Sequence, residues 1–183
     1  MIKKQGFKVS PRSIKEIRNI ANVFVKHSKV KSFPIMHVLE IVLPKLYENF
    51  SLEIVDDAKM GDNHGLTLPN ENIIKLKASV YLGACNCNGR DRYTVAHEIG
   101  HLILHRGDAI KFAYNENANI RIFEDSEWQA NTFAAELLMP FDLVKEYNSV
   151  DDIVRDFDVS REAAEIRLER IRREQKKQQH QRQ

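Results

Sequence analysis

A single H-E-x-x-H motif, formed by residues 97–101, constrains this 183-residue chain more than any other feature. If the motif is helical, His97 and His101 lie one turn apart on the same face. Two imidazoles with this spacing can bind one zinc ion, and Glu98 can take a proton from a water molecule at the metal. A motif this short also occurs by chance, so the competing interpretation is a helix with two surface histidines.

The residues around the motif argue against a surface helix. The apolar residues of this segment are Val95, Ala96, Ile99, Leu102 and Ile103. They predict a largely buried helix, in which two histidines need compensating partners. Gly100 lies in its middle, where glycine costs about 1 kcal/mol relative to alanine. We therefore expect another element to pack closely against the backbone at Gly100.

The third zinc ligand is expected from outside this helix. His105 continues the four-residue spacing, but it would lie about 12 Å from His97 along a straight helix axis. Zinc takes its ligands at about 2.1 Å, so His105 is expected behind the ligands or as a helix cap. The longer motif with a third histidine is absent, because the chain has Leu104 and Gly107 where that motif needs glycine and histidine.

Glu127 is the best candidate for the third ligand. It lies in a capping box, residues 126–129, that opens a new helix. Small residues at its i+3 and i+7 positions would let this helix approach Gly100. Asn131, one turn further, could orient a ligand through a hydrogen bond. Two other acidic residues stay open as alternatives, namely Glu124 and Asp125.

Peptide hydrolysis at such a site also needs a hydrogen-bond donor for the oxyanion that forms. Three side chains are candidates, and the sequence does not decide among them: Tyr93, Tyr114 and His105. A strand is predicted at 73–81. If that strand is an edge near the site, an extended substrate could pair with it.

Two segments carry a resemblance to a known family. Residues 97–105 read HEIGHLILH, and residues 127–140 read EWQANTFAAELLMP. These segments and their spacing resemble the ImmA/IrrE family of zinc metallopeptidases. The resemblance covers about residues 64–142 and extends more loosely to 157–168.

The resemblance implies a gluzincin-type site, with His97, His101 and Glu127 on Zn²⁺ and Glu98 as the general base. It also implies a cytoplasmic endopeptidase whose partner is a protein substrate. That substrate would be a transcriptional repressor or an antitoxin-like regulator, often of a phage or mobile genetic element.

The same resemblance implies a zincin-like metallopeptidase fold, and the residue pattern predicts its α+β elements. We expect N-terminal helices, a small antiparallel three-stranded sheet, the H-E-x-x-H helix, the Glu127 helix and a C-terminal helical extension. The first predicted helices run from Pro11 to about His27 and from Pro34 to Leu46, with a kink or end at Pro44. Strands are predicted at 52–55, 66–68 and 73–81, followed by a loop at 83–89 and by the motif helix, capped by Asp91 or Thr94. A further helix starts at Ser126 and stops before Pro140, and the last helices are predicted at 141–147, at 150–157 and after Ser160.

Three parts are expected along the chain: a metallopeptidase domain at 1–148, a helix-turn-helix-like extension at 149–175 and a disordered polar tail at 176–183. The extension could meet DNA phosphates through its arginines. Because glutamates alternate with these arginines, a salt-bridged or protein-docking helix is favoured over a DNA-binding one. The rival functions are therefore a DNA-binding regulator, or a sensor whose zinc site is not catalytic.

The composition narrows the setting. A net charge of +2 gives no overall field toward nucleic acid or a membrane. Two cysteines form no disulfide framework, which favours a reducing, cytoplasmic compartment. The N-terminus lacks the apolar run of a signal peptide, and no segment approaches the ~20 apolar residues of a membrane helix.

Overall fold

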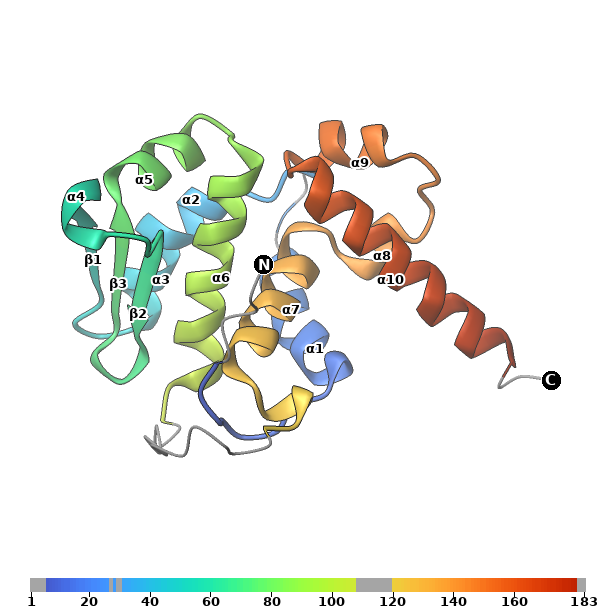
Figure 1. Ribbon diagram of the computed structural model, residues 1–183, viewed down its shortest axis with the longest axis horizontal. Coiled ribbons are helices and arrows are strands. Elements are labelled where there is room, and N and C mark those ends of the chain that lie inside the picture. Colours follow the sequence, from blue (N-terminus) through green and yellow to red (C-terminus); the bar gives the residue numbers. More distant parts are fainter. Residues whose placement is uncertain (1–5, 27, 29–30, 108–119, 181–183) are drawn as a thin grey trace.

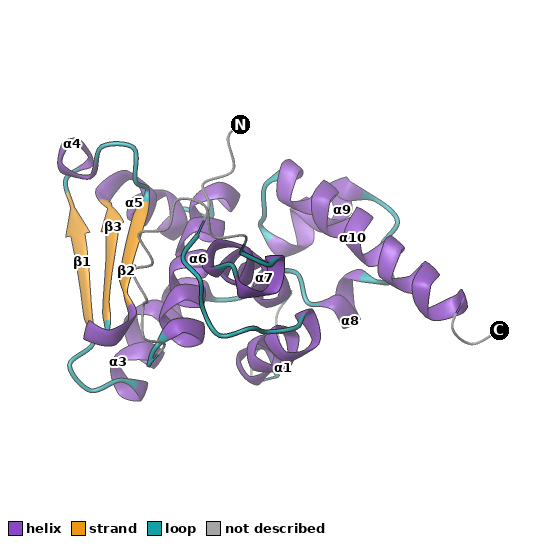
Figure 2. Ribbon diagram, turned by 60° about the horizontal axis from the view of Figure 1, so that its bottom comes forward, coloured by secondary structure: helices purple, strands orange, loops and turns teal. Residues whose placement is uncertain are grey.

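Two helices that pack against each other form the centre of the molecule: α6 (Gly89–His105) and α7 (Ser126–Leu138). The structure is a computed structural model that describes residues 6–26, 28, 31–107 and 120–180. The sheet forms one end of the molecule and the last turns of the C-terminal helix form the other (Figures 1 and 2). The fold is mixed α+β, in agreement with the class expected from the sequence.

α6 begins earlier than the sequence predicted. Its N-cap is Asn88, whose side chain accepts hydrogen bonds from the backbone N–H groups of Arg90 and Asp91. The caps predicted at Asp91 or Thr94 are therefore wrong. The preceding Cys87 adopts a left-handed backbone conformation (φ 61°), which turns the chain so that an asparagine, a favoured N-cap residue, can start the helix.

α7 is capped by Asp125, one residue before the predicted Ser126. The Asp125 carboxylate accepts from the N–H groups of Glu127 at 2.8 Å and Trp128 at 3.1 Å. Ser126 instead accepts a hydrogen bond from the N–H of Phe7. α7 ends at Leu138, before Pro140, as the sequence predicted.

The close approach expected at Gly100 is confirmed. A Cβ atom at this position would lie 3.1 Å from the Phe133 ring and 3.2 Å from the Cα atom of Ala130. Both contacts are tighter than ordinary van der Waals packing, and both neighbours belong to α7. Glycine therefore allows α6 and α7 to come close enough for their side chains to share one site.

The sheet is mixed rather than antiparallel. It contains β1 (Ser51–Val55), β2 (Gly65–Leu68) and β3 (Ile73–Lys77), in the order β1-β3-β2. β2 and β3 are antiparallel neighbours because the short 3₁₀ turn η2 (Pro69–Glu71) joins them. The segment that connects β1 to β2 includes α4 (Asp57–Met60) and places β2 at the opposite edge of the sheet. β3 then lies between the two strands and runs parallel to β1.

β3 also ends sooner than the strand predicted at 73–81. Residues 78–85 form α5 (Ala78–Cys85), which replaces part of the loop predicted at 83–89. Val80 and Ala84 are the buried residues of α5, and their four-residue spacing is helical. The alternation seen at 73–77 therefore does not continue past Lys77.

The N-terminal helices differ in their boundaries. α1 (Ile14–Val25) starts at a capping box between Ser13 and Glu16, not at Ser10 and Pro11. The next helical segment consists of α2 (Ile35–His37), the π-helical turn η1 (Val38–Val42) and α3 (Leu43–Leu46). Pro44 does not end this segment, because it lies in the first turn of α3, where a missing N–H is tolerated.

The C-terminal helices are α8 (Phe141–Val144), α9 (Val150–Phe157) and α10 (Arg161–His180). α10 continues through His180, so the tail predicted as disordered from 176 is helical to that point. Residues 181–183 lie outside the described part. Lysine, glutamine and glutamate are good helix formers and need no burial, which is why the helix extends past its last packed turn.

A buried ion-pair network fastens α10 to the body of the protein. Arg167 on α10 forms a bidentate pair with Glu136 on α7, at 2.6 and 2.9 Å, and both side chains are almost fully buried. Arg18 on α1 bonds to the same carboxylate and to Glu174 on α10.

Among the described helices, none is both long and apolar enough to cross a bilayer.

Candidate metal centre

Three side chains converge where α6 faces α7. The Nε2 atoms of His97 and His101 lie 3.0 Å apart. The Glu127 carboxylate places Oε2 at 3.3 Å from His97 Nε2 and Oε1 at 3.2 Å from His101 Nε2. Within the described residues, these three form the one group of histidine, cysteine and acidic side chains close enough to share a metal ion.

The donor set fits zinc. Tetrahedral ligands with bonds of about 2.1 Å lie about 3.4 Å from one another, close to the three separations observed here. Two imidazole nitrogens and one carboxylate oxygen are also ordinary zinc donors, and three protein ligands leave a fourth position open. The Glu127 side chain is 31% exposed, so the cluster is accessible from outside.

Neighbouring groups orient both histidines. His97 Nδ1 lies 3.2 Å from Asn131 Oδ1, which directs its Nε2 toward the cluster. His101 Nδ1 lies 3.1 Å from the ring of His105, which is 3% exposed. Asn131 and His105 thus contact the far sides of the two histidines.

The charge state of Glu127 suits a ligand. Burial opposes ionisation of this carboxyl, but the hydrogen bonds from His101 and His97 outweigh it and hold the pKa of Glu127 well below its usual range. Burial disfavours the charged form of His97 and lowers its pKa, but the hydrogen bond to Glu127 and the nearby Glu98 and Glu127 carboxylates together leave that pKa raised.

The alternative acidic residues lie elsewhere. Asp125 caps α7, and Glu124 in the 3₁₀ turn η3 (Ile122–Glu124) lies 3.8 Å from the Lys8 ammonium. Glu127, the candidate favoured from the sequence, is the one that meets the histidines.

Glu98 is held by strand β2, a contact that the sequence interpretation missed. Thr67 Oγ1 donates to Glu98 Oε2 at 2.6 Å. A Cβ atom at Gly65 would lie 2.6 Å from Glu98 Cγ and 2.7 Å from Oε1. Thr67 therefore holds one carboxylate oxygen, and Gly65 leaves space for the other. Side chains alternate between the two faces of a strand, so the sequence places Gly65 and Thr67 on one face of β2. No pattern in the neighbouring sequence shows that this face meets α6.

The candidate oxyanion donors have different positions. The Tyr93 hydroxyl donates to the Asn131 carbonyl at 2.9 Å, and burial raises the pKa of Tyr93 to about 12, so it stays a protonated donor. His105 is behind His101, away from the open side of the cluster. Tyr114 lies outside the described residues.

The strand predicted to pair with substrate is not an edge. β3 is hydrogen-bonded to β1 on one side and to β2 on the other, so its backbone is not available. β2 is the edge strand that contacts α6 and Glu98.

Comparison with known families gives one match. Residues 50–169 match the family model Peptidase_M78, the IrrE N-terminal-like domain. The matched segment spans β1 to the first half of α10 and includes all three residues of the cluster. The chain belongs to the ImmA/IrrE family of metallopeptidases. The resemblance seen in the motif segments is thereby confirmed. No curated protein matches the chain.

Proposed function

We propose that this chain is a zinc-dependent endopeptidase that cleaves a regulatory protein. The observation that carries the proposal is the convergence of His97, His101 and Glu127 within 3.3 Å of one another, beside a buried glutamate. By family resemblance, the substrate is a transcriptional repressor or an antitoxin-like factor of a phage or mobile element. The two exposed free thiols, Cys85 and Cys87, support a reducing, cytoplasmic setting.

The metal would be held by His97 Nε2, His101 Nε2 and the Glu127 carboxylate. Zinc at this place supplies a Lewis acid that polarises the scissile carbonyl and makes a water molecule more acidic. Asn131 Oδ1 would accept a hydrogen bond from Nδ1–H of His97, which keeps the proton on Nδ1 and leaves the Nε2 lone pair free for the metal.

Glu98 is the proposed general base. Its Oε2 is occupied by Thr67, so Oε1 is the oxygen that would accept the proton from the attacking water. The same oxygen would later give that proton to the leaving amine, so no net proton is gained or lost by the carboxylate. Tyr93 and Tyr114 remain the candidate oxyanion donors.

An extended substrate is proposed to pair with β2. This strand is at the sheet edge, and its residues Gly65 and Thr67 already contact the general base. Main-chain pairing along β2 would place a peptide bond beside Glu98 without requiring a particular side chain.

The contacts of the C-terminal helix argue against DNA binding. Of the five arginines that could have met phosphate, four already bond to groups of the protein: Arg161 to Asp151, Arg167 to Glu136, Arg172 to the Asn148 carbonyl and Arg173 to Glu169. This pattern supports a helix that packs on the metallopeptidase domain. The division of the chain at residue 148 remains a proposal.

Metal analysis combined with a cleavage assay tests the function. The purified wild type is expected to hold one zinc per chain, and Glu127→Ala to lose it, because two histidines alone bind zinc weakly. Glu98→Gln should keep the zinc and stop cleavage of the co-expressed regulator.

Three outcomes would overturn the proposal. Full zinc retention in Glu127→Ala would remove the third ligand. Equal loss of the regulator with wild type and Glu98→Gln would favour a zinc-containing sensor that acts without hydrolysis. A salt-sensitive gel shift that persists after zinc removal would favour a DNA-binding regulator.

A further inference from the structure

A groove of ≈ 820 Å³ leads from the metal cluster to the C-terminal helix. Its walls come from the start of α6, from α7 and from the first half of α10. Two of its lining residues, Glu127 and Asn131, also belong to the metal cluster. A chain bound at the cluster can therefore extend into the groove, whose size is that of sites that enclose several side chains.

Part of the groove surface is apolar. Tyr93 from α6, Trp128 from α7 and Ile166 from α10 all line it. Ile166 is 55% exposed, whereas the neighbouring Arg167 and Leu168 of α10 are buried. A groove lined by an exposed isoleucine and a tryptophan is suited to hold a large apolar side chain.

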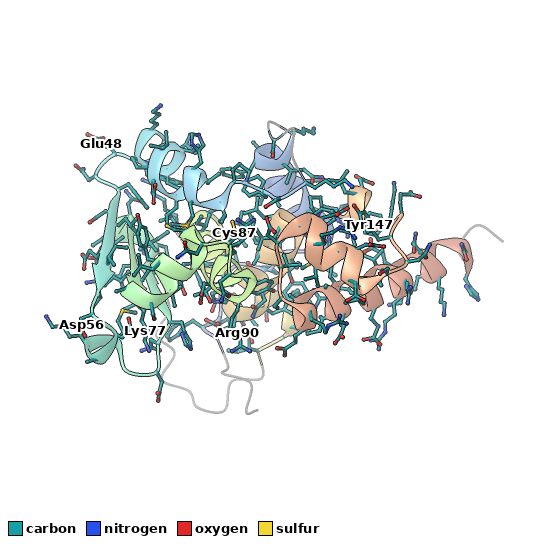
Figure 3. The ribbon with its side chains drawn as sticks, turned by 90° about the horizontal axis from the view of Figure 1, so that it is seen from above. Glu48, Asp56, Lys77, Cys87, Arg90 and Tyr147 are labelled. Carbon is teal, nitrogen blue, oxygen red and sulfur yellow. The ribbon has the colours of Figure 1, made fainter. Side chains whose placement is uncertain are left out.

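Two guanidinium groups flank this apolar surface without an internal partner. Arg90 lies where the start of α6 meets the beginning of α10 (Figure 3). Arg170 comes from α10. Within the described part of the chain, neither has a carboxylate at ion-pair distance, in contrast to Arg167 in the same groove, which is paired with Glu136.

The described carboxylates of the groove do not form ion pairs with these two arginines. Asp125 is engaged as the cap of α7, and Glu127 is engaged with the two histidines. Glu162 on the exposed rim is the remaining one. The lining holds three arginines and three carboxylates and so has no net positive charge; the attraction for an acidic group is local to Arg90 and Arg170, which have no carboxylate at ion-pair distance in the described structure.

We propose that this groove binds the substrate segment next to the scissile bond and selects a large apolar residue close to an acidic one. Arg170 is the specificity-determining residue, because it is half-buried in the groove that Tyr93 also lines, where a charge pair is less screened than at the exposed Arg90. The C-terminal helix then forms one wall of the active site. This proposal rests on the proposed peptidase function.

Cleavage profiling tests the selection. The zinc-loaded full chain is incubated with a degenerate library of synthetic peptides, and the cleaved bonds are read by mass spectrometry. We expect Asp or Glu to be enriched at one position near the cut, with a large apolar residue beside it. Arg170→Glu should remove that enrichment and lower kcat/KM for the acidic peptides about tenfold or more. Arg170→Gln should give a smaller loss, and Arg173→Glu, on the same helix outside the groove, none.

Binding to the Glu98→Gln protein separates this proposal from the peptidase function. A fluorescent acidic peptide should bind about tenfold tighter than the same peptide with lysine at that position, and Arg170→Gln should abolish the difference. No cleavage by the wild type, with this binding preference intact, would refute the peptidase function alone. Cleavage or binding without an acidic preference, or with one that Arg170→Gln leaves unchanged, would refute the groove proposal. Duplex DNA displacing the peptide in an Arg170-dependent manner would assign the groove to nucleic acid and also refute it.

Discussion

Gly65→Ala tests whether strand β2 holds Glu98, the proposed general base, in place. The new Cβ atom would lie 2.6 Å from Glu98 Cγ and 2.7 Å from Oε1, whereas ordinary contacts begin at 3.4 Å. Glu98 would have to move by about 0.8 Å, and a displacement of about 1 Å at a reacting group can cost about 100-fold in rate. We therefore expect kcat to fall by about 100-fold, equivalent to about 2.7 kcal/mol of transition-state stabilisation.

The assay measures kcat on a cleaved peptide together with zinc content and thermal unfolding. Zinc content should stay at the wild-type level, because Gly65 and Glu98 are not ligands. Thr67→Ser is the matched control on the same strand, since it keeps the hydroxyl that bonds to Glu98 and should retain most activity. Thr67→Val removes this bond and should lower kcat with zinc still bound.

Wild-type kcat in Gly65→Ala would refute the argument that β2 holds Glu98 in place. Loss of zinc in the same variant would show that the substitution acts on the whole site instead.

Two further predictions concern the support of the metal and the attachment of α10. Asn131→Ala should lower zinc affinity by about 10- to 100-fold, measured by competition with a chelator, because His97 loses the group that orients it. Glu136→Gln should cost about 3–5 kcal/mol in urea unfolding at pH 7, because it leaves the Arg167 guanidinium buried without its counter-ion. Burial opposes ionisation of Glu136, but Arg167 and Arg18 lower its pKa below 4.5. This carboxylate therefore contributes stability above that pH, which is lost as the pH falls through the folded-state pKa. The wild type should lose stability there more steeply than Glu136→Gln, and equal slopes would contradict the network.

Local sequence carried most of the candidate metal-binding set. His97 and His101 needed only helical spacing, and Glu127 followed from a helix start, small residues on one face and the glycine at 100. The histidine spacing and the helix start are short-range patterns, in which neighbours in the chain are also neighbours in space, whereas the fit of Ala130 against Gly100 joins two helices. The family assignment followed from the same two segments.

The errors arose where the partner of a residue is distant in the chain. β1 and β3 are parallel because a crossover separates them, and strand periodicity does not encode the direction of pairing. The end of β3 at Lys77 depended on the packing of Val80 and Ala84, which overrode the extended pattern. Helix starts moved by one to six residues because several capping side chains were available near each of them.

For the H-E-x-x-H helix, the sequence alone determined that two histidines and a glutamate share one turn, because helical geometry is local. Only the tertiary structure decided what surrounds them. β2 holds Glu98 through Gly65 and Thr67, although 31 residues separate Thr67 from Glu98. α10 borders the cluster because Arg167 pairs with Glu136. Such contacts depend on how the helices and the sheet edge pack, and packing is decided by shape and charge across the whole molecule rather than by spacing along the chain.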